Sequence, residues 1–370
     1  MFHNFYVTFG KFLIYTFVKK YTAVAFATVA MTVAMQGRIF IPADDPAILF
    51  TGRTICIEEG ARMFNYPGVS ARLNFTGTNL QMSTSPGSGY FVVEIDSLPP
   101  RKIFYSSNDS ILTIAGNLPD TAHQARITYA QEGFEFHPVI KGFMIDDERT
   151  LLDPPEKQKL KMEFIGNSIT CGYGTEGADG EEHFSYATEN HCLSYAYLTA
   201  RALDADANIV ARSGIGVYRN FGGPKDGSPE GTMPQEYDNT MIYDKSVPWD
   251  FSSFSPDIIC INLGTNDLSS SNYDINIFEC AYKKFLDHVR EKNPDSKIVL
   301  LTGSMLNGDD LSVIKDVLDR IAVNRKNVFR FDMSPQTGDL GYGSDYHPSA
   351  AQSRKMAEEL TSFLKTKLYE

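Results

Sequence analysis

This chain contains a serine and a histidine that could together catalyse acyl transfer. Ser168 lies in Gly166-Asn-Ser-Ile-Thr170, directly after an apolar run, and His347 lies near the C-terminus before Pro348. Acyl transfer needs a hydroxyl nucleophile, an imidazole that takes and returns its proton, and donors for an oxyanion. Ser168 and His347 are therefore the predicted catalytic pair.

Oxyanion donors are available at the ends of three predicted strands. The first donor is the N–H group of Ser168 itself. Gly214 and Gly216 follow a second strand, and Asn266 follows a third. We expect the Ser168 N–H, the N–H of Gly214 or Gly216, and the Asn266 amide to form an oxyanion hole. By analogy with known oxyanion holes, each donor would lower the barrier by about 3 kcal/mol.

Each of these features also has an ordinary structural interpretation. Glycine, asparagine and serine are common wherever a strand enters a turn. Gly264-Thr-Asn-Asp267 could cap a helix, and His347 could bond the backbone at the start of one. These interpretations do not explain why all the features follow strand ends in one half of the chain. Their combination favours catalysis.

The elements that must position these residues follow from the periodicity after residue 161. Strands are expected at 161–166, 208–212, 257–263, 297–302 and 328–332, and helices at 191–203, 274–291, 309–323 and 349–367. Alternation of this kind predicts a parallel α/β sheet with helices on both faces. Ligands bind such sheets at the carboxyl ends of the strands. The predicted site residues all follow such ends.

The preceding part of the chain has a different rhythm. Between residues 42 and 153, short alternating stretches are separated by clusters of Gly, Pro, Asn and Ser. Strands of this length and spacing predict an antiparallel β-sandwich. A polar segment with two prolines follows at 153–159 and marks a boundary. We therefore expect a β-sandwich domain at 42–153 and an α/β domain at 160–370.

Composition excludes several classes of protein. The 370 residues are 42% hydrophobic and 22% charged, which is ordinary for a globular chain. A net charge of -12 argues against a nucleic-acid surface, which needs clustered Lys and Arg. The five cysteines form no CxxC pair and no metal-ligand spacing, so no metal site is predicted. A bridge between Cys171 and Cys192 is left open.

The first 37 residues have the composition of a targeting segment. Lys19 and Lys20 precede an uncharged stretch of small and apolar residues at 21–35. A basic segment followed by an apolar one of this length favours an export signal cleaved near 33–37. A single membrane anchor is the alternative. Either way, we expect an exported protein, periplasmic or extracellular.

The motifs together resemble a known family. Gly166-Asn-Ser-Ile-Thr170, the glycine loop, Gly264-Thr-Asn-Asp267 and Asp345-Tyr-His-Pro348 are similar to the four blocks of the GDSL-like, or SGNH, hydrolases. The segment from Phe164 to Gly174, and an N-terminal β domain with Phe75 before Thr-Gly-Thr and a His137-Pro138 lead-in, resemble carbohydrate esterase family 2 more specifically.

That resemblance implies both a fold and an activity. The fold would be a jelly-roll domain followed by an SGNH-hydrolase domain with a flavodoxin-like sheet. The activity would be removal of O-acetyl groups from plant polysaccharides such as xylan and glucomannan, with no metal or organic cofactor. The implied partner is an acetylated oligo- or polysaccharide, and neither nucleic acid nor a membrane-lipid substrate is expected.

Two positions depart from the pattern of the resembled superfamily. Asn167 stands before the nucleophile, where an Asp is usual. The superfamily's acid lies three residues before the histidine, and here that position is Ser344, while Asp345 is one residue closer. An Asp345 carboxylate could orient His347 in a triad. A backbone carbonyl could do so in a Ser–His dyad, and the sequence leaves both arrangements open.

Aromatic residues are the predicted sugar contacts, since aromatic faces stack on sugar rings. Tyr173, Tyr218 and Tyr346 flank the predicted site residues, and the lone Trp249 lies in a loop before the third strand. Packing of Trp249 between the domains is an equal alternative. The rival functions are an esterase or lipase for another acyl group, and a carbohydrate-binding protein that has lost activity. Loops rich in Gly, Asn, Asp and Tyr disfavour a long apolar acyl chain.

Overall fold

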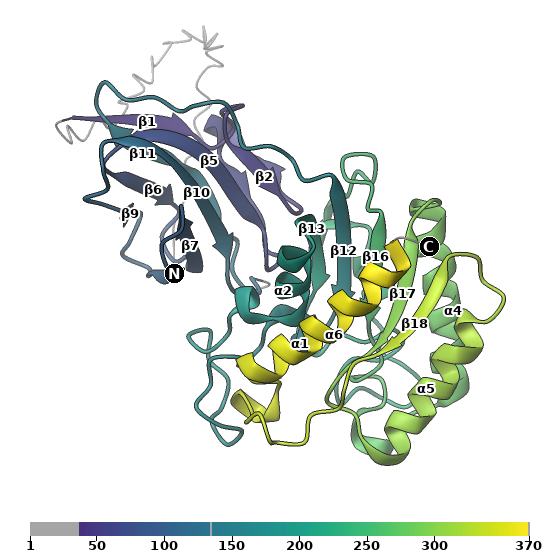
Figure 1. The fold of residues 1–370 in the computed structure, drawn as a ribbon. Helices are drawn as coiled ribbons and strands as arrows, with labels where there is room; N and C mark the ends of the chain where they lie inside the picture. The colour runs from purple at the N-terminus through teal and green to yellow at the C-terminus, as the bar shows by residue number, and fades with distance from the viewer. Residues whose placement is uncertain (1–36, 134, 369–370) are drawn as a thin grey trace, which may run out of the picture. The chain divides into compact units, whose positions relative to one another are not determined.

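The computed structural model describes residues 37–133 and 135–368, and Figure 1 shows their arrangement. The predicted export signal or anchor over residues 1–37 therefore lies outside the described residues, apart from its last position. Among the helices in the described ranges, none is long and apolar enough to cross a membrane.

The N-terminal part consists of two antiparallel sheets. One has the order β3 (Ile55–Cys56), β4 (Arg62–Met63), β11 (Val139–Asp146), β6 (Leu80–Thr84) and β9 (Ile111–Ala115), with β1 (Arg38–Pro42) also on β11. The other has the order β2 (Leu49–Thr51), β5 (Ser70–Gly77), β10 (Thr121–Tyr129), β7 (Gly89–Ile95) and β8 (Arg101–Tyr105). The sandwich predicted from alternating short strands is confirmed.

The sandwich core follows from alternation along its strands. Ala71, Leu73 and Phe75 of β5 are fully buried at every second position, and they share one core cluster with Phe91 and Ile127 from the neighbouring strands. Successive side chains of a strand point to opposite faces. Alternation therefore places one apolar row of each strand between the sheets.

The C-terminal part contains a five-stranded parallel sheet. Its order is β13 (Ala205–Ala211), β12 (Leu160–Gly166), β16 (Ile258–Asn262), β17 (Lys297–Thr302) and β18 (Val328–Asp332). All of its pairs are parallel. This confirms the predicted α/β fold, with strand bounds within a few residues of those expected.

Helices cover both faces of this sheet (Figure 1). The helices α2 (Tyr195–Ala202) and α6 (Ala350–Leu368) pack with Phe164 and Cys260, whereas α4 (Ile275–Lys292) and α5 (Gly308–Ala322) pack with Ile165 and Ile261. Because neighbouring strand residues face opposite ways, Phe164 and Ile165 anchor opposite layers. The helix predicted at 191–203 is divided, since Ser194 ends a 3₁₀ turn at His191–Leu193 and caps α2.

Three strand ends are aligned at the carboxyl edge of the sheet. Gly166, the last residue of β12, is paired in register with Ala211 of β13 and Asn262 of β16. The loops that carry Ser168, Gly214 and Asn266 therefore leave the sheet at one level. This alignment brings the predicted site residues to one edge.

Candidate active site

The predicted nucleophile begins a short helix at the end of β12. Asn167 caps α1 (Ser168–Cys171), and its side-chain oxygen accepts a hydrogen bond from Ile169 N at 3.1 Å. Gly166 is required here because a Cβ atom would collide with the Thr170 side chain. As the first helical residue, Ser168 has a backbone N–H with no partner inside the helix.

His347 meets Ser168 directly. Its Nε2 atom lies 2.9 Å from Ser168 Oγ. Burial lowers the pKa of His347 to about 4, so the imidazole is neutral at pH 7. A neutral imidazole at this distance can accept the hydroxyl proton. The structure thus brings together the two residues predicted as the catalytic pair.

The other ring nitrogen of His347 faces a backbone carbonyl and not a carboxylate. His347 Nδ1 lies 3.2 Å from the backbone oxygen of Asp345. The Asp345 carboxylate instead accepts hydrogen bonds from Tyr173 Oη at 2.7 Å and Phe184 N at 2.9 Å, and contacts His183 Nδ1 at 3.0 Å. These bonds, above all those from His183 and Tyr173, lower the pKa of Asp345.

The triad with an Asp345 carboxylate is therefore not the arrangement found. Asp345 and Tyr346 both have left-handed backbone conformations, with φ of 50° and 58°. This tight turn presents the Asp345 carbonyl to His347 while its side chain is held by the loop at 183–184. Ser344, at the superfamily's acid position, is buried and bonds Thr188 Oγ1 at 3.1 Å.

The predicted oxyanion donors differ in availability. Within the described residues, the N–H groups of Ser168 and Gly214 have no hydrogen-bond acceptor. Asn266 Nδ2 donates one hydrogen to Ile215 O at 2.7 Å, which leaves its second hydrogen for a ligand. Gly216 is different, because its N–H donates to an asparagine oxygen, Asn220 Oδ1, at 3.1 Å. Gly214 is thus the better candidate of the two glycines.

Asp267 is a contributor that the sequence analysis did not identify. Its buried carboxylate accepts hydrogen bonds from the backbone N–H groups of Val217, Tyr218 and Arg219, at 2.8 to 3.2 Å. Burial raises the pKa of Asp267 to about 6, and the three N–H bonds oppose that rise. Asp267 holds the loop after Gly216 and does not cap a helix, since Asp274 caps α4.

The predicted aromatic contacts take several different positions. The Tyr173 ring lies 4.0 Å from the His347 ring and 4.1 Å from the Phe184 ring, so its two faces are covered. Tyr218 is buried and accepts a bond from Asp274 N. Tyr346 is half exposed, with its hydroxyl bonded to Glu181. Tyr346 is the most exposed of the three tyrosines.

Trp249 lies at the opposite edge of the sheet from Ser168. Its ring covers the buried Arg53 guanidinium at 4.9 Å, and Arg53 comes from the β-sandwich. Trp249 lines a cavity of about 410 Å³ with Lys161 and Asp206, which lie near the amino ends of β12 and β13. Ser168 follows the carboxyl end of β12. Trp249 therefore packs between the two parts of the chain and is not a sugar contact beside Ser168.

Asn167 keeps the cap while losing the charge of the usual Asp. It is fully buried, and its Nδ2 atom has no partner within the described residues. The nucleophile keeps its contact with His347 all the same. The thiols of Cys171 and Cys192 are both free and buried, so no disulfide joins them.

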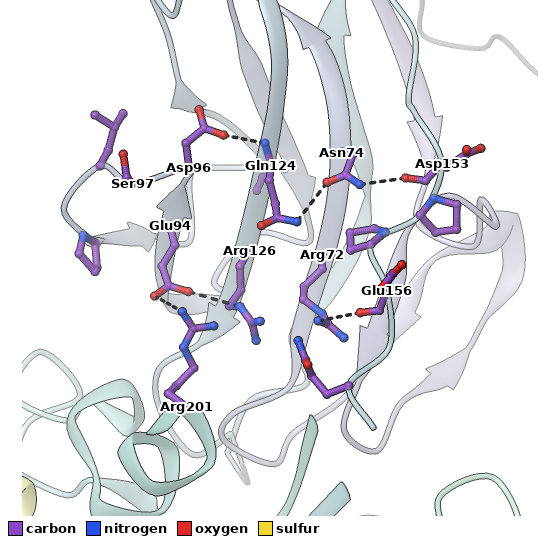
Figure 2. Close-up of a pocket in the computed structure, with 16 residues that line it drawn as sticks. Arg72, Asn74, Glu94, Asp96, Ser97, Gln124, Arg126, Asp153, Glu156 and Arg201 are labelled. Carbon is purple, nitrogen blue, oxygen red and sulfur yellow. Dashed lines mark hydrogen bonds and ion pairs between the residues drawn. The ribbon is translucent and has the colours of Figure 1, made fainter. Parts of the chain in front are cut away.

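A polar groove on the sandwich does not belong to this site. The groove has a volume of about 670 Å³. Figure 2 shows the side chains that line it, most of them from β5, β7 and β10 and the segment at 153–158. Three of its charged residues pair with one another, since Glu94 contacts Arg126 at 3.4 Å and Arg201 at 3.6 Å. Neither Ser168 nor His347 lines it. The groove is best explained as a charged contact between the sandwich and α2.

Comparisons with known proteins agree with the two-part architecture. The family described as Carbohydrate esterase 2 N-terminal matches residues 50–155, and the GDSL-like Lipase/Acylhydrolase family matches residues 164–355. An acetylxylan esterase / glucomannan deacetylase of Cellvibrio japonicus is 31% identical over 332 residues, which are 88% of this chain and 90% of that protein.

Two further relatives extend the comparison. The cellulase/esterase CelE of Acetivibrio thermocellus is 35% identical over 88% of this chain, which spans only 40% of that protein's length. A solved family two carbohydrate esterase from Clostridium thermocellum, in complex with cellohexaose, superposes with a TM-score of 0.80 at 34% identity. That match covers 87% of this chain and 99% of the other.

Proposed function

We propose, from the premise that this chain belongs to carbohydrate esterase family 2 of the GDSL-like hydrolases, that it is a serine acetylesterase. Its substrate would be an O-acetylated plant polysaccharide of the xylan or glucomannan type, as the name of the Cellvibrio japonicus relative suggests. The observation that carries the proposal is the 2.9 Å contact between Ser168 Oγ and a neutral His347 Nε2.

The first half of the reaction forms an acetyl-enzyme. Ser168 Oγ attacks the acetyl carbonyl while His347 Nε2 takes the hydroxyl proton. The N–H groups of Ser168 and Gly214 and the Asn266 amide stabilise the oxyanion. When the intermediate collapses, the bond to the sugar oxygen breaks and His347 returns its proton to that oxygen. The sugar leaves as a free alcohol.

The second half releases acetate. Water attacks the acetyl-enzyme with His347 again as the base, and Ser168 recovers its proton as acetate departs. Throughout, the Asp345 carbonyl accepts the Nδ1–H of His347, which keeps Nε2 as the basic nitrogen. The Tyr173 ring, which lies against the imidazole with an interplanar angle of 31°, restrains it in the same orientation. We thus propose a Ser–His dyad oriented by a backbone oxygen.

Sugar contacts and cellular context are part of the same proposal. Tyr346 supplies a half-exposed aromatic face next to His347 in sequence, which suits stacking on a sugar ring. We propose that residues 42–153 and 160–370 form the two domains. Residues 1–37 would direct export to the periplasm or to the outside of the cell, as a cleaved signal or an anchor. An exported enzyme would meet its acetylated polysaccharide substrate outside the cytoplasm.

Acetate release from acetylated xylan and acetylated glucomannan tests the proposal. The wild type should release acetate, and Ser168→Ala should lose at least about a thousandfold in rate. Ser253→Ala, an exposed serine at the amino edge of the sheet, is the matched control and should keep full rate. Binding without release by the wild type would favour a carbohydrate-binding protein. Hydrolysis of p-nitrophenyl acetate without acetate release from either polysaccharide would favour an esterase that acts on another ester.

A further inference from the structure

A segment of the β-sandwich makes hydrogen bonds with the backbone of loops beside the candidate active site. Residues 130–133 follow the end of β10, and Ala130 O accepts a hydrogen bond from His191 N at 2.7 Å. The next residue but one, Glu132, is buried, and its N–H donates to Glu189 Oε2 at 3.2 Å. The sandwich thus places a carboxyl group behind the nucleophile.

One oxygen atom of Glu132 contacts two of the three segments that carry oxyanion donors. Glu132 Oε2 accepts a hydrogen bond from Ser213 N at 2.7 Å, and Ser213 directly precedes Gly214. The same atom accepts a weaker bond from Cys171 Sγ at 3.7 Å, and Cys171 ends the helix that Ser168 begins. The distance between the Ser168 and Gly214 N–H groups therefore depends on a residue from the other part of the chain.

Mere packing does not account for this carboxyl group. Burial raises the pKa of Glu132, and burial next to Glu132 raises the pKa of Glu189 well above its ordinary value. Burying carboxyl groups costs more free energy than burying apolar side chains of the same size. Neither group exchanges a proton in the proposed reaction. A need for hydrogen-bond acceptors for the N–H groups of Ser213 and Glu132 would explain the presence of these two carboxyl groups.

Metal binding is a weaker explanation of the same cluster. Glu132, Cys171 and Glu189 have potential ligand atoms within 4.8 Å of one another. However, Glu132 Oε2 is directed at N–H and S–H donors, which would have to give way to a cation. Burial also raises the pKa of the Cys171 thiol well above its ordinary value, which disfavours a thiolate ligand.

We infer that Glu132 is a positioning residue for the oxyanion hole, and that through it the β-sandwich completes the active site. The inference rests on the proposed function, in which Ser168 and Gly214 donate to the oxyanion. Other backbone bonds also hold this loop, such as Phe221 N to Gly214 O at 2.8 Å, but among the described residues only the Glu132 acceptor joins Ser213 N to the helix that Ser168 begins. Without that acceptor, the Ser213–Gly214 backbone can shift relative to Ser168. Displacements of about 1 Å in such sites can cost a hundredfold in rate.

Two nearly isosteric variants of Glu132 test the hydrogen-bond acceptor separately from the size of the side chain. Glu132→Gln keeps an acceptor oxygen, and Glu132→Leu removes it. Asn65→Ala is the matched control, because the buried Asn65 side chain also joins the sandwich to the second part of the chain, at Ile242 N and O. Its bond to the 130–133 segment uses the backbone oxygen, which accepts from Gly133 N and is kept in the variant. The readouts are kcat and KM for p-nitrophenyl acetate, the rate of inactivation by diethyl p-nitrophenyl phosphate, and Tm.

We expect Glu132→Leu to lose about 10- to 100-fold in kcat and in inactivation rate, with KM little changed. Glu132→Gln should stay within about threefold of the wild type, and Asn65→Ala should lower Tm without lowering kcat. Wild-type kcat and inactivation rate in folded Glu132→Leu would overturn the inference. If Glu132→Leu does not fold, Glu132→Asp is used, because its side chain is one methylene shorter and moves the oxygen away from Ser213 N. A loss of kcat and inactivation rate would support the inference, and wild-type values would overturn it.

Failure of the inference can be told from failure of the proposed function. If Ser168→Ala still hydrolyses p-nitrophenyl acetate at the wild-type rate, the proposed nucleophile is wrong. If Ser168→Ala is inactive while Glu132→Leu keeps full kcat, only the role of Glu132 is wrong.

Discussion

The imidazole of His347 is oriented by the backbone oxygen of Asp345, 3.2 Å from Nδ1, while the carboxylate of the same residue is bonded to Tyr173. A carbonyl oxygen can hold the same tautomer as a carboxylate but carries no full charge to stabilise the imidazolium. Burial lowers the pKa of His347 to about 4, and the bond to the Asp345 carbonyl opposes that lowering. Catalysis here would depend more heavily on the oxyanion donors.

Replacing Asp345 by Asn should therefore have a modest effect. Asn keeps an acceptor for Phe184 N and leaves the backbone oxygen in place, so we expect less than about a tenfold loss in kcat for acetate release. In enzymes with a true Asp in the triad, the same change costs about 10⁴-fold. His347→Ala, measured in parallel, should lose at least about 10³-fold. A loss for Asp345→Asn as large as that for His347→Ala would mean that the carboxylate takes part.

The activity should persist into mildly acidic solution. The pKa of His347 is lowered to about 4 by burial, so its basic form predominates above that pH and is lost below it. The profile of kcat/KM should be level from neutrality down to about pH 5 and then fall. An acidic limb centred above pH 6 would contradict this.

The same shift has a consequence for folding. Because the folded pKa of His347 lies below the unfolded value of 6.5, the unfolded state binds more protons between the two values. The contribution of His347 to the free energy of unfolding therefore decreases as the pH falls from about 6.5 to 4. Urea denaturation at pH 7 and pH 5, compared between wild type and His347→Gln, measures this contribution, which should vanish in the variant.

Asn266 should affect the transition state more than substrate binding. Asn266→Ala removes a donor and leaves Ile215 O without its 2.7 Å partner. We expect kcat to fall by about 10²- to 10³-fold with little change in KM, as for other oxyanion donors. Asn220→Ala, which removes the acceptor for Gly216 N, is the comparison and should cost much less. Equal losses for the two variants would argue for a general loosening of the loop.

Trp249 should matter for stability and not for catalysis. Trp249→Ala exposes the Arg53 guanidinium, which Trp249 covers at 4.9 Å, and should lower the free energy of unfolding by about 1–3 kcal/mol. Chemical denaturation gives that value, and acetate release from the same sample should match the wild type. A raised KM for polysaccharide with unchanged stability would return Trp249 to the sugar-binding surface.

Both folds, and the edge at which the site forms, follow from the pattern of residues along the chain. Period-two alternation predicts a two-faced sheet, and alternating strands and helices predict parallel pairing. Parallel strands bring their carboxyl ends to one edge, so the pattern of strands alone was enough to group Ser168, Gly214 and Asn266. The pattern does not mark every strand, because in β11 Lys141 and Gly142 interrupt the apolar residues.

The direction of individual side chains and carbonyl groups depends on contacts between distant parts of the chain. Asp345 lies two residues from His347, and a left-handed turn decides that its carbonyl and not its carboxylate faces the ring. The contact of the Trp249 ring with Arg53, and the hydrogen bond from Gly216 N to Asn220 Oδ1, are not indicated by any pattern in the sequence. Glu132 is 81 residues from Ser213, and the hydrogen bond that joins them exists only because the sandwich packs against the loops of the second sheet. Side-chain direction and long-range contact depend on packing, which periodicity does not encode.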